Sequence, residues 1–439
     1  MIDFAPLLAA YPVDQKILCG KDYQMTAQDI EQQMEMLDLS AIPPGSSVAV
    51  IGDFDPASIV ALIQLFQKGC VVVPLTVHTR SQHDYFFNAA AVQYVVEKGI
   101  VKAQPDPPMQ PPIMVELGQQ GKAGLIMFSS GTSGRPKAIL HDVEKIMARF
   151  KTAKKTLRTI SFLMFDHWGG LNTFFYTLYA GGQIIVPDSL DPESVFRSVE
   201  RYRAELLPTT PTFLRLACRT VDFESLDLSS LKLITYGTEV MDEITLSRVT
   251  ALLPETDFRQ TYGLSELGVF SVRSRARDSL FIQIGGDGVK TRILDNVLWI
   301  SSPFQMIGYL NETSPFDSEG FYNTKDIVEV DGEWLRITGR DSEIVNIGGV
   351  KVSPIDVEEA VCGLKGVVEA QAFGRPNPVT GQHLELKVVL SPENAPAVSE
   401  IKKALRQILP EASQPSRIQA VEEIPRSHRF KRTGNGMPQ

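Results

Sequence analysis

The chain has no long hydrophobic segment and no recognisable export signal. None of its apolar runs, in 439 residues, reaches the roughly 18 to 20 residues that a membrane-spanning helix needs. The first residues, Met1 to Pro6, contain no basic region ahead of an apolar stretch, which a secretory signal requires. The sequence therefore predicts a protein without a membrane span that resides in the cytoplasm.

Cysteine is scarce. The four cysteines, Cys19, Cys70, Cys218 and Cys362, are far apart. They provide neither the spacing of a metal site nor a disulfide framework, so we expect buried thiols in a reducing compartment. No motif places a His or Asn beside Cys218, which argues against a cysteine nucleophile.

Positive charge is also in deficit. The 43 Lys and Arg residues face 52 Asp and Glu residues, which gives a formal net charge of −9. A general nucleic-acid binder needs an excess of basic side chains. Nucleic acid is therefore not an expected partner.

What the sequence does contain is an alternation of apolar strands and amphipathic helices. Residues 48–52 and 70–75 have the pattern of buried strands, and residues 57–67 between them have that of a helix packed on a sheet. This order predicts an α/β fold with helix-covered, mainly parallel sheets. The length exceeds that of a usual single domain. Short segments at about 281–337 predict a small β-rich subdomain, and residues 343–439 predict a small α+β module.

A run of hydroxyls, glycines and a lysine follows the apolar strand expected at 124–128. Such a loop turns backbone N–H groups and hydroxyls toward one anion, because glycine permits the positive φ values that an anion-binding nest needs. The terminal lysine adds a charge for a phosphate, although the spacing is not that of P-loop NTPases. The predicted phosphate-binding residues are Ser129, Ser130, Gly131, Thr132, Ser133, Gly134 and Lys137. The alternative is an ordinary surface loop.

Two later segments carry groups that suit the rest of a nucleotide. Tyr262 is placed to stack on a base, and Glu266 offers a carboxylate of the kind that Mg²⁺ accepts together with phosphate oxygens. Asp326 is able to accept hydrogen bonds from both ribose hydroxyls, with a turn residue in a polar loop as the alternative. Arg340 is expected at the same ribose or at a phosphate.

Together these motifs resemble those of the ANL superfamily of adenylating enzymes, which includes acyl-CoA synthetases, adenylation domains of peptide synthetases and luciferases. The resemblance covers nearly the whole chain, although the chain is short for the family. Five motifs occur in the family's order: the phosphate loop at 129–137, the Tyr-Gly-x-Ser-Glu motif at 262–266, the Thr-Gly-Asp-like motif at 324–326, Gly-Arg at 339–340 and a final lysine.

The resemblance implies a two-step reaction. A carboxylate attacks the α-phosphate of ATP to give an acyl-adenylate and pyrophosphate, and a thiol then attacks the acyl carbonyl and releases AMP. The implied cofactors are ATP, Mg²⁺ and coenzyme A, or the phosphopantetheine of a carrier protein. The implied domains are an N-terminal adenylation domain at 1–339, a hinge at 340–342 and a mobile C-terminal lid at 343–439. No pattern sets the oligomeric state.

The same resemblance assigns further residues. Gly237, Thr238 and Glu239 are implied to line the adenine; Tyr262, Gly263, Ser265, Asp326 and Arg340 complete the nucleotide site; and Glu266 serves as metal ligand and catalytic residue. Gly348 and Gly349 resemble the glycine loop that approaches the pantetheine arm in the thioester-forming state. An ordinary hairpin is the alternative for these two glycines.

The C-terminal segment 424–431 resembles the family motif in which a lysine lies six residues after a proline. This makes Lys431 the adenylation lysine. A solvated basic tail is the alternative, because Arg426, Arg429 and Arg432 are nearby, and Phe430 stands where the family usually has glycine.

Residues 165–171 resemble the Phe-His-x-x-Gly stretch of acyl- and aryl-CoA ligases. This makes His167 a catalytic residue at the edge of the acid pocket, with a structural histidine at a helix start as the alternative. Asp166 would instead suit the ammonium group of an amino acid, but the Gly-Gly-Leu that follows favours His167. The expected apolar walls of the pocket are Thr210, Pro211, Thr212, Phe213 and Tyr236. They do not identify the carboxylic acid.

Two positions depart from the family pattern. Ser342 stands at the hinge where Asp or Lys is usual, and Lys325 replaces a glycine beside Asp326, so the Lys325 side chain must turn away from the ribose. Three functions remain open: a ligase that makes an acyl-CoA, a stand-alone enzyme that loads a carrier protein, and a catalytically weakened nucleotide-binding relative.

Overall fold

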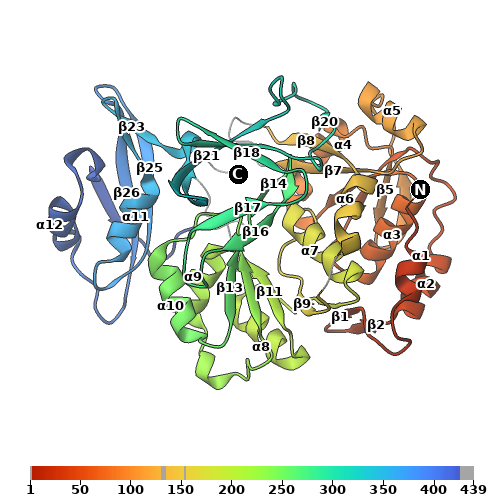
Figure 1. Cartoon of the computed structure of the whole chain (residues 1–439), viewed down its shortest axis with the longest axis horizontal. Coiled ribbons are helices and arrows are strands. Elements are labelled where there is room, and N and C mark those ends of the chain that lie inside the picture. The colour runs from red at the N-terminus through yellow and green to blue at the C-terminus, as the bar shows by residue number, and fades with distance from the viewer. Residues whose placement is uncertain (1, 130–134, 153–154, 426–439) are drawn as a thin grey trace.

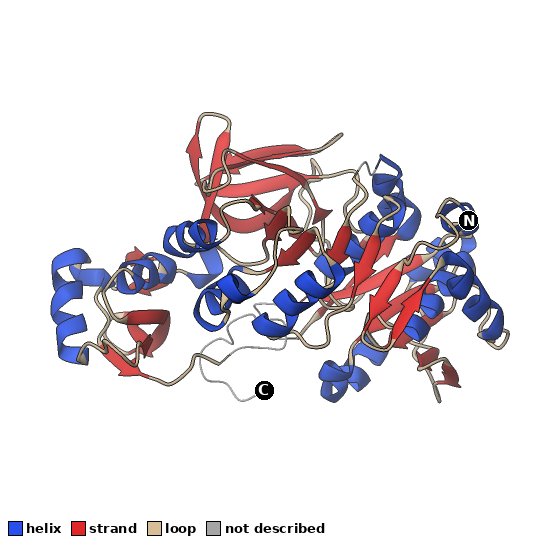
Figure 2. Cartoon of the chain, turned by 90° about the horizontal axis from the view of Figure 1, so that it is seen from below, coloured by secondary structure: helices blue, strands red, loops and turns tan. Residues whose placement is uncertain are grey.

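The computed structural model describes residues 2–129, 135–152 and 155–425. The described strands form two seven-stranded sheets, a six-stranded antiparallel sheet, a two-stranded hairpin and a five-stranded C-terminal sheet. Figure 1 shows the C-terminal part, in blue, at one end of the molecule beyond α9 (Pro211–Thr220) and α10 (Glu243–Leu252). Figure 2 shows the same arrangement from below. The α/β fold with a separate α+β module is therefore confirmed.

The first seven-stranded sheet contains the strands that the sequence predicts most clearly. Its order is β20 (Gly308–Tyr309), β8 (Lys137–Asp142), β7 (Gly124–Ser129), β4 (Val71–Leu75), β3 (Ser47–Ile51), β5 (Tyr94–Glu97) and β6 (Ile100–Ala103). Strands β7, β4, β3 and β5 run parallel, whereas β8 and β20 pair antiparallel at one side. The helix α3 (Pro56–Gln67) connects β3 to β4 and begins where Asp55 accepts the Ser58 N–H.

The second sheet is built in the same way from later strands. Its order is β13 (Asp257–Gln260), β12 (Leu233–Tyr236), β11 (Leu206–Thr209), β9 (Arg158–Ile160), β10 (Gln183–Ile185), β1 (Leu18–Gly20) and β2 (Tyr23–Met25). All neighbours are parallel except β1 and β2. A core of buried side chains from both sheets, α3 and α7 (Trp168–Tyr179) joins the two sheets. It contains the ring contacts of Phe54 with Phe165 and Phe174.

The remaining helices of this part cover the sheets. They are α1 (Ala5–Ala9), α2 (Ala27–Met36), α4 (His83–Ala89), α5 (Pro112–Gln119), α6 (Val143–Ala148) and α8 (Pro192–Tyr202). None of the helices in the described part of the chain is long and apolar enough to cross a bilayer.

The third sheet is antiparallel and lies beside the carboxyl ends of β11 and β12. Its order is β16 (Ser271–Ser274), β17 (Ile282–Gly285), β22 (Trp334–Arg340), β21 (Tyr322–Asp331), β19 (Val297–Ser301) and β18 (Lys290–Leu294). It extends beyond the expected 281–337 range at both ends. The short hairpin β14 (Gly263–Leu264) and β15 (Gly268–Val269) precedes it.

The C-terminal module has its own hydrophobic core. Its sheet contains β24 (Val350–Val352), β23 (Val345–Ile347), β26 (Gly381–Leu390), β25 (Val367–Asn377) and β27 (Arg417–Ala420), with α11 (Pro354–Cys362) and α12 (Val398–Ile408). Ser353 accepts the Asp356 N–H and starts α11, as the sequence predicts. The chain enters this module through the 3₁₀ turn Asp341–Glu343, where the resemblance places a hinge.

Candidate active site

A pocket of about 420 Å³ lies where the two parallel sheets meet the antiparallel sheet. We call it the central pocket. It brings together nine predicted residues from segments far apart in the sequence: Ser129, Lys137, His167, Thr238, Tyr262, Gly263, Ser265, Glu266 and Arg340. The sequence motifs therefore converge on one cavity.

One corner of the central pocket holds a lysine and a carboxylate. Lys137 is the first residue of β8, and its Nζ lies 4.9 Å from the centre of the Tyr309 ring. The Tyr309 hydroxyl donates a hydrogen bond of 2.8 Å to Oε1 of Glu266, which is buried. Burial and the Glu266 charge raise the pKa of Tyr309, so its hydroxyl stays protonated as the donor. This corner offers a cation to a phosphate chain and a carboxylate to a divalent cation bound with it.

Tyr309 is the functional neighbour that the sequence motifs did not identify. It lies on β20, which pairs antiparallel with β8 so that Tyr309 is opposite Ile139. This pairing joins residues about 170 positions apart, and local patterns carry no signal for it. Tyr322 lies close to the same carboxylate, and burial together with the Glu266 charge raises its pKa.

A second cluster surrounds Asp326. Its Oδ2 accepts 2.6 Å from the Tyr262 hydroxyl and its Oδ1 accepts 2.9 Å from Nε of Arg340. The Asp326 charge raises the pKa of Arg340 against the opposing effect of burial, and burial with the same charge raises the pKa of Tyr262. A carboxylate has about four acceptor positions, so both oxygens keep capacity for ribose hydroxyls. The Tyr262 ring also packs against Phe270.

Lys325 has a backbone conformation that favours glycine. Its φ is +59°, in the left-handed region that a side chain rarely adopts. The residue is exposed at the rim of the central pocket, and its N–H binds Oδ1 of Asn323. Beside this lysine, the Asp326 carboxylate accepts its bonds from Tyr262 and Arg340.

Gly237 is required because β12 and the segment after β13 approach closely. A Cβ at this position would lie 2.3 Å from Oγ1 and 2.7 Å from the carbonyl oxygen of Thr261. Thr238, which follows, has φ of +70° and lines the pocket, and Glu239 accepts the Thr212 N–H at 3.1 Å. The predicted adenine segment is therefore shaped by backbone contact.

We expect Gly237→Ala to destabilise the fold by about 1–3 kcal/mol, because the Thr261 backbone must move to admit a methyl group. The KM for ATP should rise as the 237–239 segment shifts. Urea unfolding and initial rates at varied ATP measure both effects. Gly285→Ala is the matched control, because a Cβ there meets nothing within 4 Å. Equal behaviour of the two variants would contradict the steric argument.

His167 has a structural role as well as a place in the pocket. It is the N-cap of α7, and its Nδ1 accepts the Gly169 N–H at 3.1 Å. The neutral ring therefore carries its proton on Nε2. Gly170 permits this tight start, since a Cβ there would lie 2.2 Å from the carbonyl oxygen of Met164. The helix-start alternative is observed, and the residue still lines the central pocket.

The prediction of the pocket's apolar walls was wrong for most of the residues named, because they do not line the central pocket. Phe213 and Tyr236 are fully buried in the core of the second sheet, and Thr210 caps α9 from a buried position. Pro211 is buried as the first residue of that helix. Thr235 of β12 and its partner Pro208 of β11 face the cavity instead, because side chains alternate along β12 and Tyr236 points to the core. The observed lining residues include Met127, Phe128, Leu163, Pro208, Thr209 and Thr235.

Asp166 also borders the central pocket and is buried. Its Oδ2 accepts a 3.3 Å hydrogen bond from the Thr76 hydroxyl. The pocket thus contains a carboxylate beside His167, as well as Asn172 and Thr173 from α7. Its lining is mixed rather than apolar.

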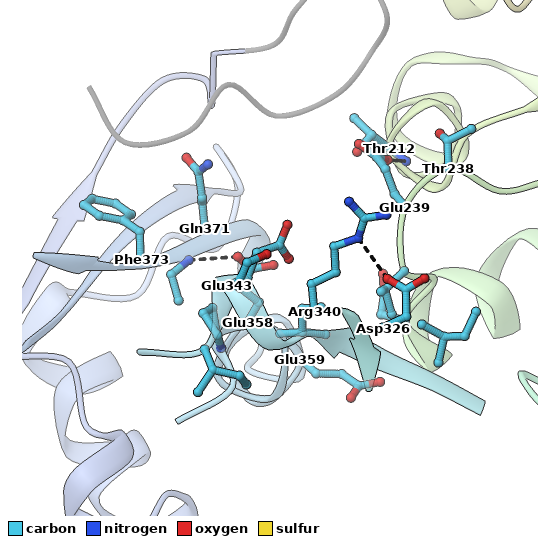
Figure 3. A pocket seen from close by; sticks show the side chains of 18 of the residues that line it. Thr212, Thr238, Glu239, Asp326, Arg340, Glu343, Glu358, Glu359, Gln371 and Phe373 are labelled. Carbon is cyan, nitrogen blue, oxygen red and sulfur yellow. Dashed lines mark hydrogen bonds and ion pairs between the residues drawn. The ribbon is translucent and has the colours of Figure 1, made fainter. Parts of the chain in front are cut away.

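A second cavity of about 580 Å³ separates the C-terminal module from the rest of the chain, and we call it the interdomain pocket. Asp326 and Arg340 lie on one side of it, and Gln371 and Phe373 of β25 lie on the other (Figure 3). Six residues line both cavities, namely Thr238, Thr261, Tyr262, Gly263, Arg340 and Ser342. The two cavities therefore adjoin at the Asp326 cluster.

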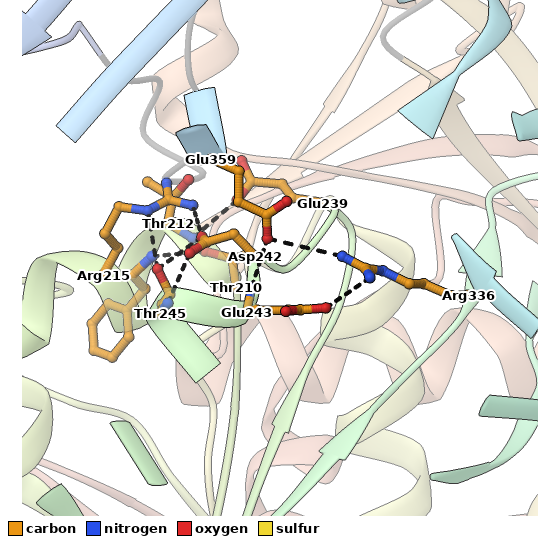
Figure 4. A network of polar contacts seen from close by, with 10 residues as sticks. Thr210, Thr212, Arg215, Glu239, Asp242, Glu243, Thr245, Arg336 and Glu359 are labelled. Carbon is orange, nitrogen blue, oxygen red and sulfur yellow. Dashed lines mark hydrogen bonds and ion pairs between the residues drawn. The ribbon is translucent and has the colours of Figure 1, made fainter. Parts of the chain in front are cut away.

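A polar network holds the module in this position (Figure 4). Arg336 of β22 binds Glu243 at 2.7 Å and lies 3.8 Å from Glu359 of α11. Glu359 also accepts the backbone N–H of Glu243 at 3.1 Å, at the first turn of α10. In the same network, Arg215 of α9 forms an ion pair of 2.7 Å with Asp242.

Some predicted residues do not join the site. Gly348 and Gly349 form the turn between β23 and β24, with φ of +59° and +90°, and line neither cavity. The hairpin alternative is what the structure shows in this arrangement. Ser130, Gly131, Thr132, Ser133, Gly134 and Lys431 lie outside the described residues.

The donor set allows one metal contact rather than a complete metal site. Within the described ranges, no group of three or more His, Cys, Asp or Glu side chains is arranged to hold a metal ion. Glu266 fits a cation that brings most of its ligands from a bound triphosphate, because Mg²⁺ commonly uses one or two carboxylates.

Cys218 does not fit a nucleophile, since burial raises its pKa to about 11.

Fold and site define an α/β protein with a central pocket that adjoins a second cavity, and the C-terminal module lines that second cavity. The profile of the AMP-binding enzyme family matches residues 9–310, and that of the AMP-binding enzyme C-terminal domain matches residues 356–431. The chain belongs to the AMP-binding enzyme family. The resemblance to ANL adenylating enzymes is confirmed.

Relatives in this family include CoA ligases. A medium/long-chain fatty-acid–CoA ligase from Mycobacterium tuberculosis is 26% identical over 349 residues, and the match spans 72% of this chain but only 61% of that relative. A feruloyl-CoA synthase from an Amycolatopsis species is 24% identical over 89% of this chain and 87% of its own length. A fatty acid–[acyl-carrier-protein] ligase from Mycobacterium marinum is 27% identical over 70% of this chain and 66% of its own length.

Solved structures share the whole fold. An anthranilate CoA ligase in complex with anthranoyl-AMP superimposes with a TM-score of 0.81 over 97% of this chain and 95% of its own, at 16% identity. At that identity the likeness establishes the fold.

Proposed function

We propose that this protein activates a carboxylic acid with ATP and transfers the acyl group to the thiol of coenzyme A. The observation that carries the proposal is a central pocket lined by Lys137 and Glu266 on one side and by Tyr262 and Arg340, the partners of Asp326, on the other. The Lys137–Glu266 corner suits a phosphate chain with its cation, and the cluster around Asp326 suits a ribose. The names of CoA ligase relatives support the same reaction.

In the first step an oxygen of the carboxylate bonds to the α-phosphorus of ATP while the bond to the bridging oxygen of pyrophosphate breaks. Two anions must approach, so cations and N–H donors lower the barrier. Lys137 supplies a charge at the phosphate side, and Asp326 fixes the ribose. Mg²⁺, when bound with ATP, would neutralise phosphate charge next to Glu266.

In the second step a thiolate sulfur bonds to the acyl carbon and AMP leaves with the bridging oxygen. His167 borders the cavity, and we propose it as the residue beside the acyl group. The module at 343–439 would rotate at 340–342 between the steps and carry Gly348 and Gly349 toward the pantetheine arm. We propose Lys431 as the adenylation lysine of this segment.

ATP–pyrophosphate exchange with aryl, fatty and amino acids tests the first step. Exchange with one class of acid is expected, and it identifies the acid. Silence with every class despite ATP binding would contradict the proposal and favour a weakened nucleotide-binding relative.

A carrier protein is the alternative acceptor. The relative named as a fatty acid–[acyl-carrier-protein] ligase supports it. Acid-dependent AMP release is measured with free CoA and with a phosphopantetheinylated carrier. Release with the carrier and none with CoA would replace CoA as the proposed acceptor.

We expect Glu266→Gln to raise the Mg²⁺ concentration needed for half-maximal adenylation by about tenfold or more, because an amide oxygen carries no charge for the cation. The Tyr309 hydrogen bond to Oε1 is retained by the amide. Mg²⁺ titration of pyrophosphate exchange measures the change. Glu329→Gln, at an exposed position of β21, is the control. An unchanged titration would remove Glu266 from the metal shell.

A further inference from the structure

His141 is a buried histidine to which none of the sequence motifs assigns a role. It lies four residues after Lys137 on β8, opposite Leu125 of β7, and is 1% exposed. Its Nε2 lies 2.7 Å from the carbonyl oxygen of Ser265. Its ring stacks on Trp168 with centres 4.5 Å apart. One side chain thus contacts the 262–266 loop and the start of α7.

The charge state of His141 is set by its surroundings. Burial lowers its pKa to about 4, so the ring is neutral near pH 7. Because a carbonyl oxygen only accepts, the proton must be on Nε2. His141 therefore acts as a fixed hydrogen-bond donor and not as an acid or base.

This donor is one of three that hold Glu266 and its preceding peptide. His141 binds the oxygen of Ser265, the Met306 N–H binds the oxygen of Glu266 at 2.8 Å, and the Tyr309 hydroxyl binds Oε1. Ile307 and Tyr309 are themselves fixed to β8, through the Leu140 oxygen and strand pairing. The same strand begins with Lys137. Lys137 and the three groups that bind Glu266 and its preceding peptide consequently all belong to β8 or to the segment 306–309 that is hydrogen-bonded to it.

We infer that His141 is a positioning residue that keeps the Glu266 carboxylate aligned with Lys137 for the triphosphate and its cation. The inference rests on the proposed function. Loss of the Nε2 donor leaves the Ser265 oxygen without that bond and lets the loop move. A displacement of about 1 Å costs as much as 10²-fold in rate when reacting groups must be aligned.

Two substitutions separate the donor from the bulk of the ring. His141→Leu keeps a similar volume without a donor, and His141→Gln keeps an N–H near the position of Nε2. We expect the Leu variant to lower the maximal rate of exchange by about tenfold or more and to raise the Mg²⁺ requirement. The KM for the acid should change by less than about threefold. The Gln variant should recover most of the rate.

A double-mutant cycle with Tyr309→Phe measures the coupling between the two side chains, which distinguishes a shared action on Glu266 from a general loss of packing. His141 and Tyr309 act on the same carboxylate, so the combined loss should differ from the product of the single losses by about threefold or more. Urea unfolding of each variant, with His78→Gln at an exposed position as control, reports stability.

Full activity of the Leu variant would overturn the inference. Equal losses of exchange rate in the Leu and Gln variants, in proportion to their losses of folding stability, would also overturn it. If the unmodified protein catalyses pyrophosphate exchange with no acid, the proposed function is wrong, and this outcome is distinct from a failure of the inference about His141. The affinity of each variant for ATP with and without Mg²⁺, measured calorimetrically, then decides the role of His141. An Mg²⁺ effect lost in the Leu variant and kept in the Gln variant supports positioning. Indistinguishable affinities contradict it.

Discussion

Lys431→Ala is expected to slow adenylation by about 10²–10³, which corresponds to about 3–4 kcal/mol, if the lysine is one donor to charge that develops in the transition state. Transfer from supplied acyl-adenylate to the thiol should be unaffected, since in the proposed second step the C-terminal module is rotated away from this arrangement. Pyrophosphate exchange measures the first step, and thiol-dependent AMP release from preformed acyl-adenylate measures the second. The prediction rests on the sequence motif, because the residue lies outside the described ranges.

Neighbouring basic residues provide matched controls for Lys431. Arg429→Ala and Arg432→Ala each remove one positive charge from the same segment. A solvated basic tail would make all three substitutions equivalent, whereas a catalytic lysine makes one of them distinct. Equal losses in the three variants, or equal losses of Lys431→Ala in both steps, would contradict the assignment.

Asp326→Ala is expected to raise the KM for ATP by about 10²-fold. The change would remove the proposed acceptor of two ribose hydroxyls, and hydrogen bonds to a charged group contribute about 1.5–3 kcal/mol each. It also leaves the Tyr262 hydroxyl and the Arg340 guanidinium without their observed acceptor. Initial rates at varied ATP, and calorimetric titration with AMP, measure the loss.

Two further variants make this test specific. Asp326→Asn keeps the shape and one acceptor oxygen, so its loss should be smaller. Glu329→Ala, three residues along β21 and exposed, should leave nucleotide binding unchanged. Nucleotide affinity that is the same in Asp326→Ala and in the unmodified protein would remove Asp326 from the ribose site.

Much of the architecture follows from local patterns. The strands at 48–52 and 70–75 are predictable because they are buried on both faces and therefore continuously apolar, and β3 and β4 confirm them. Ser353 marks the start of α11 by its capping chemistry. The grouping of Lys137, Tyr262, Glu266 and Arg340 in one cavity follows from motifs that were recognised as a set.

The rest of the site depends on contacts that no local pattern records. Tyr309 reaches Glu266 because β20 pairs with a strand about 170 residues earlier, and His141 reaches Ser265 across the same sheet edge. The wall residues were misassigned because the alternation along β12 buries Tyr236 in the core while Thr235, paired with Pro208 of β11, faces the cavity.

In the proposed first step, a carboxylate oxygen bonds to the α-phosphorus of ATP in the central pocket, between Lys137 and the Tyr262 and Arg340 side chains that bind Asp326. The acid identified by exchange, labelled with ¹⁸O in its carboxyl group, tests this most directly when turned over with ATP and the thiol. This attack predicts AMP that carries one ¹⁸O atom and pyrophosphate that carries none. Label in pyrophosphate, or unlabelled AMP formed together with the thioester, would contradict it.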